Sequence, residues 1–408
     1  MIRHQAYFDT LGMLKEDSAS WRSVFAGLSV LRLVDSYVED RASIDPSNWA
    51  QLHNVRAAIE DVGEGDPVRA VLIAVLEEAT NRATIDEVVC ASLLAYGRVL
   101  TYEANWSLAT DVYATVAKIA RPNKNPGLAI EANVAVGGSA RRDGDWETSA
   151  RAYSQAAYIA DTVGDRRGIL KVQLGIAHTY MARGNLPQAQ TILEDVIVQS
   201  ADERMTEIHA EALHSRAALA QRKGEFAEGI KLAYDALNLT TNPLDRDLVL
   251  EDLAALFTEI GLRDAARDTH LVVAATTQSR HVRATATVNL MELASIDQMP
   301  EAFDAYAREL ANIPLGPWLR SHYLLFLGEG MNRLGRTDAA KEALHEAIAF
   351  ADANQLHQVS FQAQTAMSAV KASQKTKEFT PPPAWLPEEV GSVVRAVSEL
   401  RKTTVAAA

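Results

Sequence analysis

The chain has 408 residues, of which 48% are hydrophobic, 23% are charged and only 6% are aromatic. Its net charge of −13 opposes a general attraction to nucleic acids or anionic membranes, so we expect neither as a direct partner. The longest purely apolar run, Ala70 to Leu76, is far shorter than the roughly 18 residues that a membrane span requires.

The single cysteine, Cys90, excludes an intramolecular disulfide and is expected to be a small core residue in a reducing compartment. Residues 1 to 7 lack a basic start followed by an apolar stretch, so we expect no secretory signal and a cytoplasmic location. The histidines and acidic residues show no spacing typical of a metal site, and no nucleophile accompanies a base. The sequence therefore predicts no metal, no cofactor and no enzymatic activity.

Turn residues recur along the chain at intervals of 36 to 40 residues, and each has a small residue five positions later. This period is too regular for a globular enzyme and is typical of stacked helical hairpins. We call these turn residues the anchors. They are Gly65, Ala104, Gly144, Gly184, Gly224, Gly261, Asp297 and Gly335.

Apolar residues recur at spacings of three and four between the anchors, which predicts helices along the whole chain. One or two helices are expected before the repeats, with Trp21 to Glu39 the clearer one. Short connections predict that successive helices are antiparallel neighbours. The expected pairs are 46–62 with 66–80, 86–102 with 106–120, 127–142 with 146–163, 167–182 with 186–200, 203–222 with 226–240, 245–260 with 262–276, 280–295 with 299–312, and 317–333 with 337–353.

The two ends of such a stack need covers, because a terminal repeat would otherwise expose one apolar face. We expect residues 1–45 to form an N-terminal helical cap, residues 46–354 to form about eight helix pairs, and residues 355–373 to form a C-terminal capping helix. Pro381 to Pro383 predict a Pro-rich linker over residues 374–387.

A terminal amphipathic helix is expected over residues 388–402, followed by a tail at 403–408. Val390, Val393 and Val397 lie in its apolar stripe. This helix either folds back onto its own solenoid or docks on another chain, and the second alternative gives a homo-oligomer.

The residues around the anchors resemble the tetratricopeptide repeat (TPR). Glycine lies seven positions before an anchor at Gly97, Gly137 and Gly328, and alanine takes that place at Ala177 and Ala217. The resemblance covers residues 46–354. It implies an all-α fold, a right-handed α-solenoid of antiparallel helix pairs with helical caps.

The repeats depart from the usual pattern in two ways. They lack the early tryptophan, and they are about 40 rather than about 34 residues long. Such long repeats are similar to the sensor domains of bacterial regulators, among them the peptide-pheromone-responsive ones. Armadillo or HEAT-type helix pairs are the structural alternative, which the Gly-to-Ala spacing disfavours.

In the TPR family, the first helix of each pair lines a concave groove. Carrying the family's groove positions over implies apolar groove residues such as Leu174, Met181, Met291 and Leu325. The same transfer gives the candidate partner-binding residues, which are mostly basic or polar. These are Arg98, Tyr102, Arg141, Arg142, Lys171, His178, His214, Gln221 and Arg222.

The basic groups in the middle repeats predict capture of an acidic peptide, a terminal carboxylate or another anionic ligand, because arginine offers carboxylates a planar fork of donors. Arg141, Arg142 and Arg222 also lie in the last turn of a helix, where a cation interacts favourably with the helix dipole. We therefore predict a non-catalytic protein- or peptide-binding scaffold or adaptor. The alternative is a ligand- or peptide-responsive sensor that acts on a separate effector protein, and an enzyme is the least supported.

Overall fold

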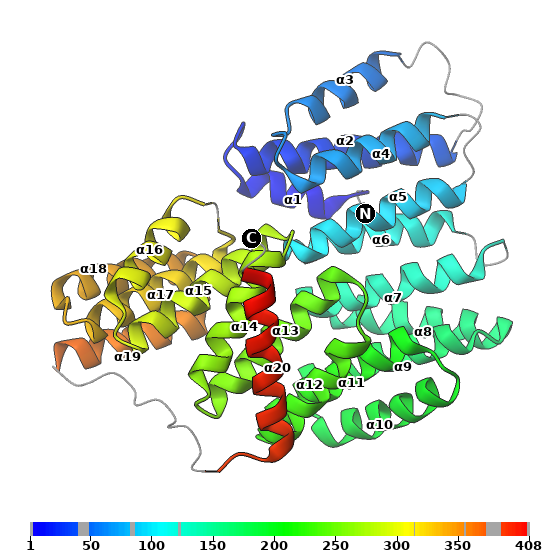
Figure 1. Ribbon diagram of the computed structural model, residues 1–408. Helices are drawn as coiled ribbons and strands as arrows, with labels where there is room; N and C mark the ends of the chain where they lie inside the picture. Colours follow the sequence, from blue (N-terminus) through cyan, green and yellow to red (C-terminus); the bar gives the residue numbers. More distant parts are fainter. Residues whose placement is uncertain are drawn as a thin grey trace. The chain divides into compact units, whose positions relative to one another are not determined.

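The computed structural model describes residues 3–39, 49–81, 86–120, 124–313, 315–354, 356–372 and 385–405. Within these residues the chain has twenty helices and no strand, which confirms the all-α prediction (Figure 1). The chain divides into two compact units, Met1–Ile192 and Leu193–Ala408, which we call unit 1 and unit 2. No helix in the described ranges is long and apolar enough to cross a membrane.

Unit 1 begins with two helices that precede the repeats and continues with helix pairs. Its helices are α1 (Gln5–Met13), α2 (Ala19–Glu39), α3 (Trp49–Glu60), α4 (Pro67–Thr80), α5 (Asp86–Tyr102), α6 (Trp106–Ile119), α7 (Pro126–Asp143), α8 (Trp146–Val163) and α9 (Arg166–Ala182). Helix α10 (Leu186–Asp202) begins in unit 1 and ends in unit 2.

Unit 2 continues the pairs and ends with two further helices. Its helices are α11 (Thr206–Lys223), α12 (Phe226–Leu239), α13 (Pro243–Glu259), α14 (Arg263–Thr276), α15 (Arg280–Ile296), α16 (Pro300–Ala311), α17 (Pro317–Arg333), α18 (Thr337–Ala353), α19 (His357–Lys371) and α20 (Glu388–Val405). The expected helices of the repeats are all present, with ends that differ from the prediction by three residues or fewer. The expected Pro-rich linker falls mostly on residues 373–384, which lie outside the described ranges. The domain boundaries stay a prediction.

Six of the eight anchors follow the first helix of their pair in a left-handed backbone conformation; one of them is Ala104, with φ 59°. Gly144, Gly184, Gly224, Gly261 and Gly335 have φ between 77° and 85°. At Gly144 the amide donates to Arg141 O and the next amide donates to Ala140 O, the hydrogen-bond pattern of a Schellman turn. Glycine suits this position because it has no Cβ to clash there.

Two anchors differ from the prediction. In the seventh repeat the left-handed residue is Gln298, with φ 55°, and the predicted anchor Asp297 has φ −80°. The Gln298 side chain donates to Ser295 O and so helps to satisfy the end of α15. Gly65 is not among the glycines with positive φ, so the first pair turns in another way.

The glycines seven positions before the anchors make room for large side chains of the second helices. A Cβ on Gly137 would lie 2.7 Å from the Tyr153 ring, and one on Gly175, which is nine positions before its anchor Gly184, would lie 2.2 Å from it. Gly97 meets Tyr113 in the same way, at 2.3 Å. In these repeats a glycine on the first helix therefore makes room for a tyrosine ring on a second helix.

The first helices of neighbouring pairs pack against one another within each unit. In unit 1, α5 contacts α7 and α7 contacts α9, while α6 and α8 show no comparable contact in the described residues. In unit 2, α11 contacts α13 and α13 contacts α15, again without comparable packing between α12 and α14. The layer of first helices is thus the tighter side of each stack.

Helix α20 packs in cis on the second helices of unit 2. It contacts α12 and α14, beside which it lies in red in Figure 1. Val390, Val393 and Val397 are buried in the core that these helices form, and the Arg401 side chain lies 3.0 Å from Asp268 Oδ1. Of the two alternatives left open by the sequence, the structure shows the fold-back.

Candidate functional site

The candidate residues fall on first helices of both units. Unit 1 holds six of them on α5, α7 and α9, and we call these six the basic face: Arg98, Tyr102, Arg141, Arg142, Lys171 and His178. Unit 2 holds His214, Gln221 and Arg222, all on α11. Each group is therefore positioned by its own unit.

Several members of the basic face are engaged within the protein. The Arg98 guanidinium donates to Glu131 Oε1 on the next first helix at 3.1 Å, and both side chains are about half exposed. The Arg142 guanidinium lies 4.9 Å from the centre of the Trp106 ring, a cation–π contact with the second helix of the preceding pair. Tyr102 and His178 also have polar partners.

Arg141 and Lys171 differ from these neighbours. Both are half-buried, on α7 and α9, which contact each other. No acidic side chain in the described part of the chain forms an ion pair with either residue, and the buried Arg141 Nε has no hydrogen-bond acceptor there. The basic face thus keeps two cations whose charge the described protein does not neutralise.

In unit 2 the corresponding polar residues are tied to neighbouring repeats. His214 Nε2 lies 2.7 Å from Asp252 Oδ2 on α13. Glu251, also on α13, accepts from His270 Nδ1 at 3.1 Å and from the Asn289 amide on α15 at 3.5 Å. Gln221 is half-buried and Arg222 is exposed with a polar partner. The contacts of His214 with Asp252 and of Glu251 with Asn289 link first helices to one another, while His270 joins α14 to α13 within one pair.

The apolar residues expected in the groove are placed differently. Leu174, Met181, Met291 and Leu325 are each 5% exposed or less, so they are core residues. The reason is the packing between successive first helices, which covers positions that would face a groove in more widely spaced pairs. Sequence positions alone overestimate how much of the first-helix face a ligand can reach.

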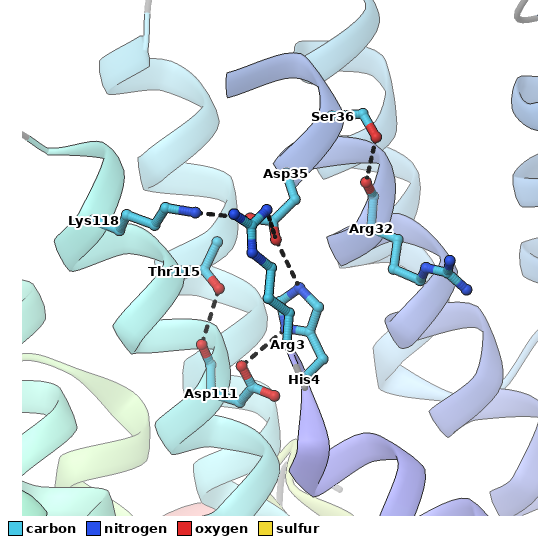
Figure 2. A network of polar contacts seen from close by, with 8 residues as sticks. All are labelled: Arg3, His4, Arg32, Asp35, Ser36, Asp111, Thr115 and Lys118. Carbon is cyan, nitrogen blue, oxygen red and sulfur yellow. Dashed lines mark hydrogen bonds and ion pairs between the residues drawn. The ribbon is translucent and has the colours of Figure 1, made fainter. Parts of the chain in front are cut away.

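A buried polar network in unit 1 was not anticipated from the sequence (Figure 2). The imidazole of His4 lies between two carboxylates, with Nδ1 2.9 Å from Asp111 Oδ1 and Nε2 3.5 Å from Asp35 Oδ2. Asp35 also accepts from the Arg3 guanidinium at 3.1 Å. These contacts fasten the segment before α1 to α2 and α6, so the network holds the N-terminal helices against the first repeats.

Cys90 is fully buried on α5, and burial raises the pKa of its thiol to about 12. Because the thiolate is the nucleophilic form, this thiol is unreactive near neutral pH. The described residues contain no group of three or more histidine, cysteine, aspartate or glutamate side chains placed to hold a metal ion.

The contacts of Arg142 with Trp106 and of Arg98 with Glu131 were not predicted from the sequence, although Glu131 lies at one of the family's groove positions. The signal for Trp106 was present, because it lies two positions after the anchor Ala104, at the start of a second helix. The Arg98–Glu131 pair joins residues 33 positions apart, and only the stacking of successive first helices brings them together.

Comparisons with known proteins bear on the fold. No family model matches the chain, and no curated protein matches it. Among solved structures, the chain is similar to NprR in complex with its cognate peptide NprX, with 15% sequence identity, a TM-score of 0.50, and coverage of 79% of this chain and 98% of that one. A Rap protein complexed with competence and sporulation factor matches with 14% identity and a TM-score of 0.37, over 86% of this chain and 98% of that one. The similarity to NprR confirms the prediction of TPR-like helical repeats.

Proposed function

We propose that this chain is a non-catalytic peptide-binding repeat protein whose basic face in unit 1 binds an acidic peptide segment. One observation carries the proposal: Arg141 and Lys171 lie on adjoining first helices without an acidic partner in the described residues. The chain has an excess of acidic residues, with a net charge of −13, so the missing acidic partners of these two cations do not reflect a shortage of acidic side chains.

The chemistry of the two cations suits a carboxylate-rich ligand. A half-buried guanidinium binds a carboxylate through two parallel hydrogen bonds, and the contact is stronger than at a fully exposed site. The dipole of α7 accounts for a cation at Arg141 in its last turn, but Lys171 lies in the first half of α9, where the dipole does not favour a cation. Helix stability alone therefore does not explain the pair.

The fold is compatible with this role. NprR, whose fold is similar, is bound to its cognate peptide in its solved structure. That observation favours, as a second candidate, a regulator that responds to a free peptide and acts on a separate protein. The two candidate functions differ in their ligand, since a regulator binds a free peptide and a scaffold binds a segment within a folded partner.

The test is a selection of random twelve-residue peptides displayed against the full chain. The proposal expects the selected peptides to be enriched in aspartate and glutamate, and expects the double variant Arg141→Glu with Lys171→Glu to lose that enrichment. Selected peptides without an acidic excess, or the same peptides selected by both proteins, would contradict it. The affinity of one selected peptide is then measured in two forms, free and inserted in a carrier protein. Binding of the free form favours the regulator, and binding of the inserted form favours the scaffold.

A further inference from the structure

A cavity of about 670 Å³ lies between α2 and α3 in unit 1, on helices that the basic face does not use. Leu28 on α2 and Val55 and Ala58 on α3 supply its apolar wall. Phe25 also lines it, and its ring stacks on Trp21 with the two centres 4.9 Å apart. The volume lies in the range of pockets that hold small ligands, about 300 to 1,000 Å³.

The two helices that form the cavity run antiparallel. The Ser23 hydroxyl, near the start of α2, donates to Asp66 Oδ2 at 2.6 Å, and Asp66 lies six residues after α3 ends. Asp61, directly after α3, is therefore at the end of the cavity near Phe25. Arg32 lies seven residues after Phe25 on α2, at the opposite end of the cavity, near Gln51.

The two ends of the cavity carry opposite charges. Arg32 and Asp61 are both exposed, and neither forms an ion pair with another described residue. In Figure 2 the Arg32 side chain points away from the network around Asp35, so that nearby carboxylate does not neutralise it. Along α2, the seven residues from Phe25 to Arg32 span about 10 Å.

We propose that this cavity binds a short free peptide whose two termini are unmodified and therefore charged. Its terminal carboxylate meets Arg32, its terminal ammonium meets Asp61, and an apolar side chain between them packs on Leu28 and Val55. An extended chain advances about 3.3 to 3.6 Å per residue, so the rise of about 10 Å along α2 from Phe25 to Arg32 corresponds to about three peptide residues. A longer peptide places one terminus beyond its partner.

The experiment is calorimetric titration of the full chain with the tripeptide Ala-Leu-Ala. Three forms are compared: free at both ends, N-acetylated, and C-amidated. The free form is expected to bind, and each blocked form is expected to bind about tenfold more weakly, because each loses one charge-assisted contact. The absence of saturable binding up to about 10 mM, or equal binding of all three forms, would overturn the proposal.

Two variants assign the ends of the ligand. Arg32→Gln is expected to bind the free and C-amidated forms equally while still discriminating against the N-acetylated form. Asp61→Asn is expected to show the reciprocal pattern. Equal weakening of all three forms in either variant contradicts the assignment. If a variant fails to fold, the comparison of the free and blocked peptides on the natural chain still tests the proposal.

The double variant Arg141→Glu with Lys171→Glu separates this cavity from the basic face. It is expected to bind the tripeptide as the natural chain does, since both substitutions lie on α7 and α9. Loss of tripeptide binding in that variant would place the tripeptide site on the basic face and contradict the present inference. Failure of acidic-peptide binding alone would contradict the proposed function and would not affect this inference.

Discussion

The first helices of the two units use polar residues differently. In unit 2, His214 contacts Asp252 on α13 and Glu251 contacts Asn289 on α15, so their polar atoms link one repeat to the next. In unit 1, Arg98 does the same through Glu131, but Arg141 and Lys171 do not. Polar residues on first helices thus either pair with a neighbouring repeat or stay without an acidic partner, depending on whether the neighbouring first helix supplies one.

The second helices differ as well. In unit 2, α20 covers α12 and α14, while in the described part of unit 1 the N-terminal helices α1 and α2 pack on α6 and no terminal helix packs on α8. The layer of first helices is the tighter one in each unit, so the second helices diverge and leave a surface that an extra helix can fill.

The largest expected effect comes from detaching α20. The double variant Val393→Asp with Val397→Asp places charges in a buried apolar stripe and detaches α20, which ends the burial of Val390 as well and removes about 4 kcal/mol of stabilisation in all. Hydrogen exchange is expected to speed up in α12 and α14 and to stay unchanged in α5 to α8.

Ser392→Asp, on the exposed side of α20, is the matched control. Unchanged exchange in α14 of the double variant would contradict docking in cis. A dimeric mass of the natural chain that becomes monomeric in the double variant would instead show that α20 docks on a second copy.

An intermediate effect is expected at the glycine contacts of unit 1. Gly175→Ala would place a methyl group 2.2 Å from the Tyr153 ring, so we expect a loss of about 1 to 3 kcal/mol in the free energy of unfolding. Gly138→Ala meets nothing closer than 3.8 Å and is expected to gain about 0.5 to 1 kcal/mol, because alanine favours a helix. Urea unfolding measures both, and changes of the same sign would contradict the packing account.

The smallest effect concerns the pH dependence of unit 2. Burial against Trp318, whose ring centre is 4.0 Å away, lowers the pKa of His322. The folded chain therefore binds this proton less readily than the unfolded chain, and stability is lost as the pH falls through the ordinary histidine pKa of about 6.5.

His322→Gln is expected to reduce the drop in melting temperature between about pH 7.5 and pH 5.5 by about 1 to 2 °C. His345→Gln, at an exposed position on α18, serves as the control. An equal change in both variants would show that His322 does not carry this dependence.

Much of the fold could be predicted from the sequence, because helix ends are encoded locally. Gly144 and Gly184 have no Cβ, and the residues before them have helical periodicity, so the turn and its period are visible in the chain. The displaced anchor at Gln298 was missed because a left-handed non-glycine residue has no distinctive sequence signal. The position of α20 was left open, since its apolar stripe fits any apolar surface.

The candidate site was harder to predict. Family positions correctly place the basic residues on first helices, but they do not say which of them the protein itself neutralises. Arg98 and His214 pair with residues 33 and 38 positions away, and such pairs depend on the register between stacked helices. The burial of Leu174 and Met291 depends on the same register, which no single repeat contains.

The most direct test of the account is the affinity of one selected acidic peptide for three forms of the chain at one ionic strength. The forms are the natural chain, Arg141→Glu with Lys171→Glu, and Arg151→Glu with Lys231→Glu, whose exposed positions lie on the second helices α8 and α12. Both variants change the net charge equally. We expect about 100-fold weaker binding for the first variant and less than about twofold for the second. Equal weakening in the two variants would show that net charge, and not the basic face, attracts the peptide, and would contradict the account.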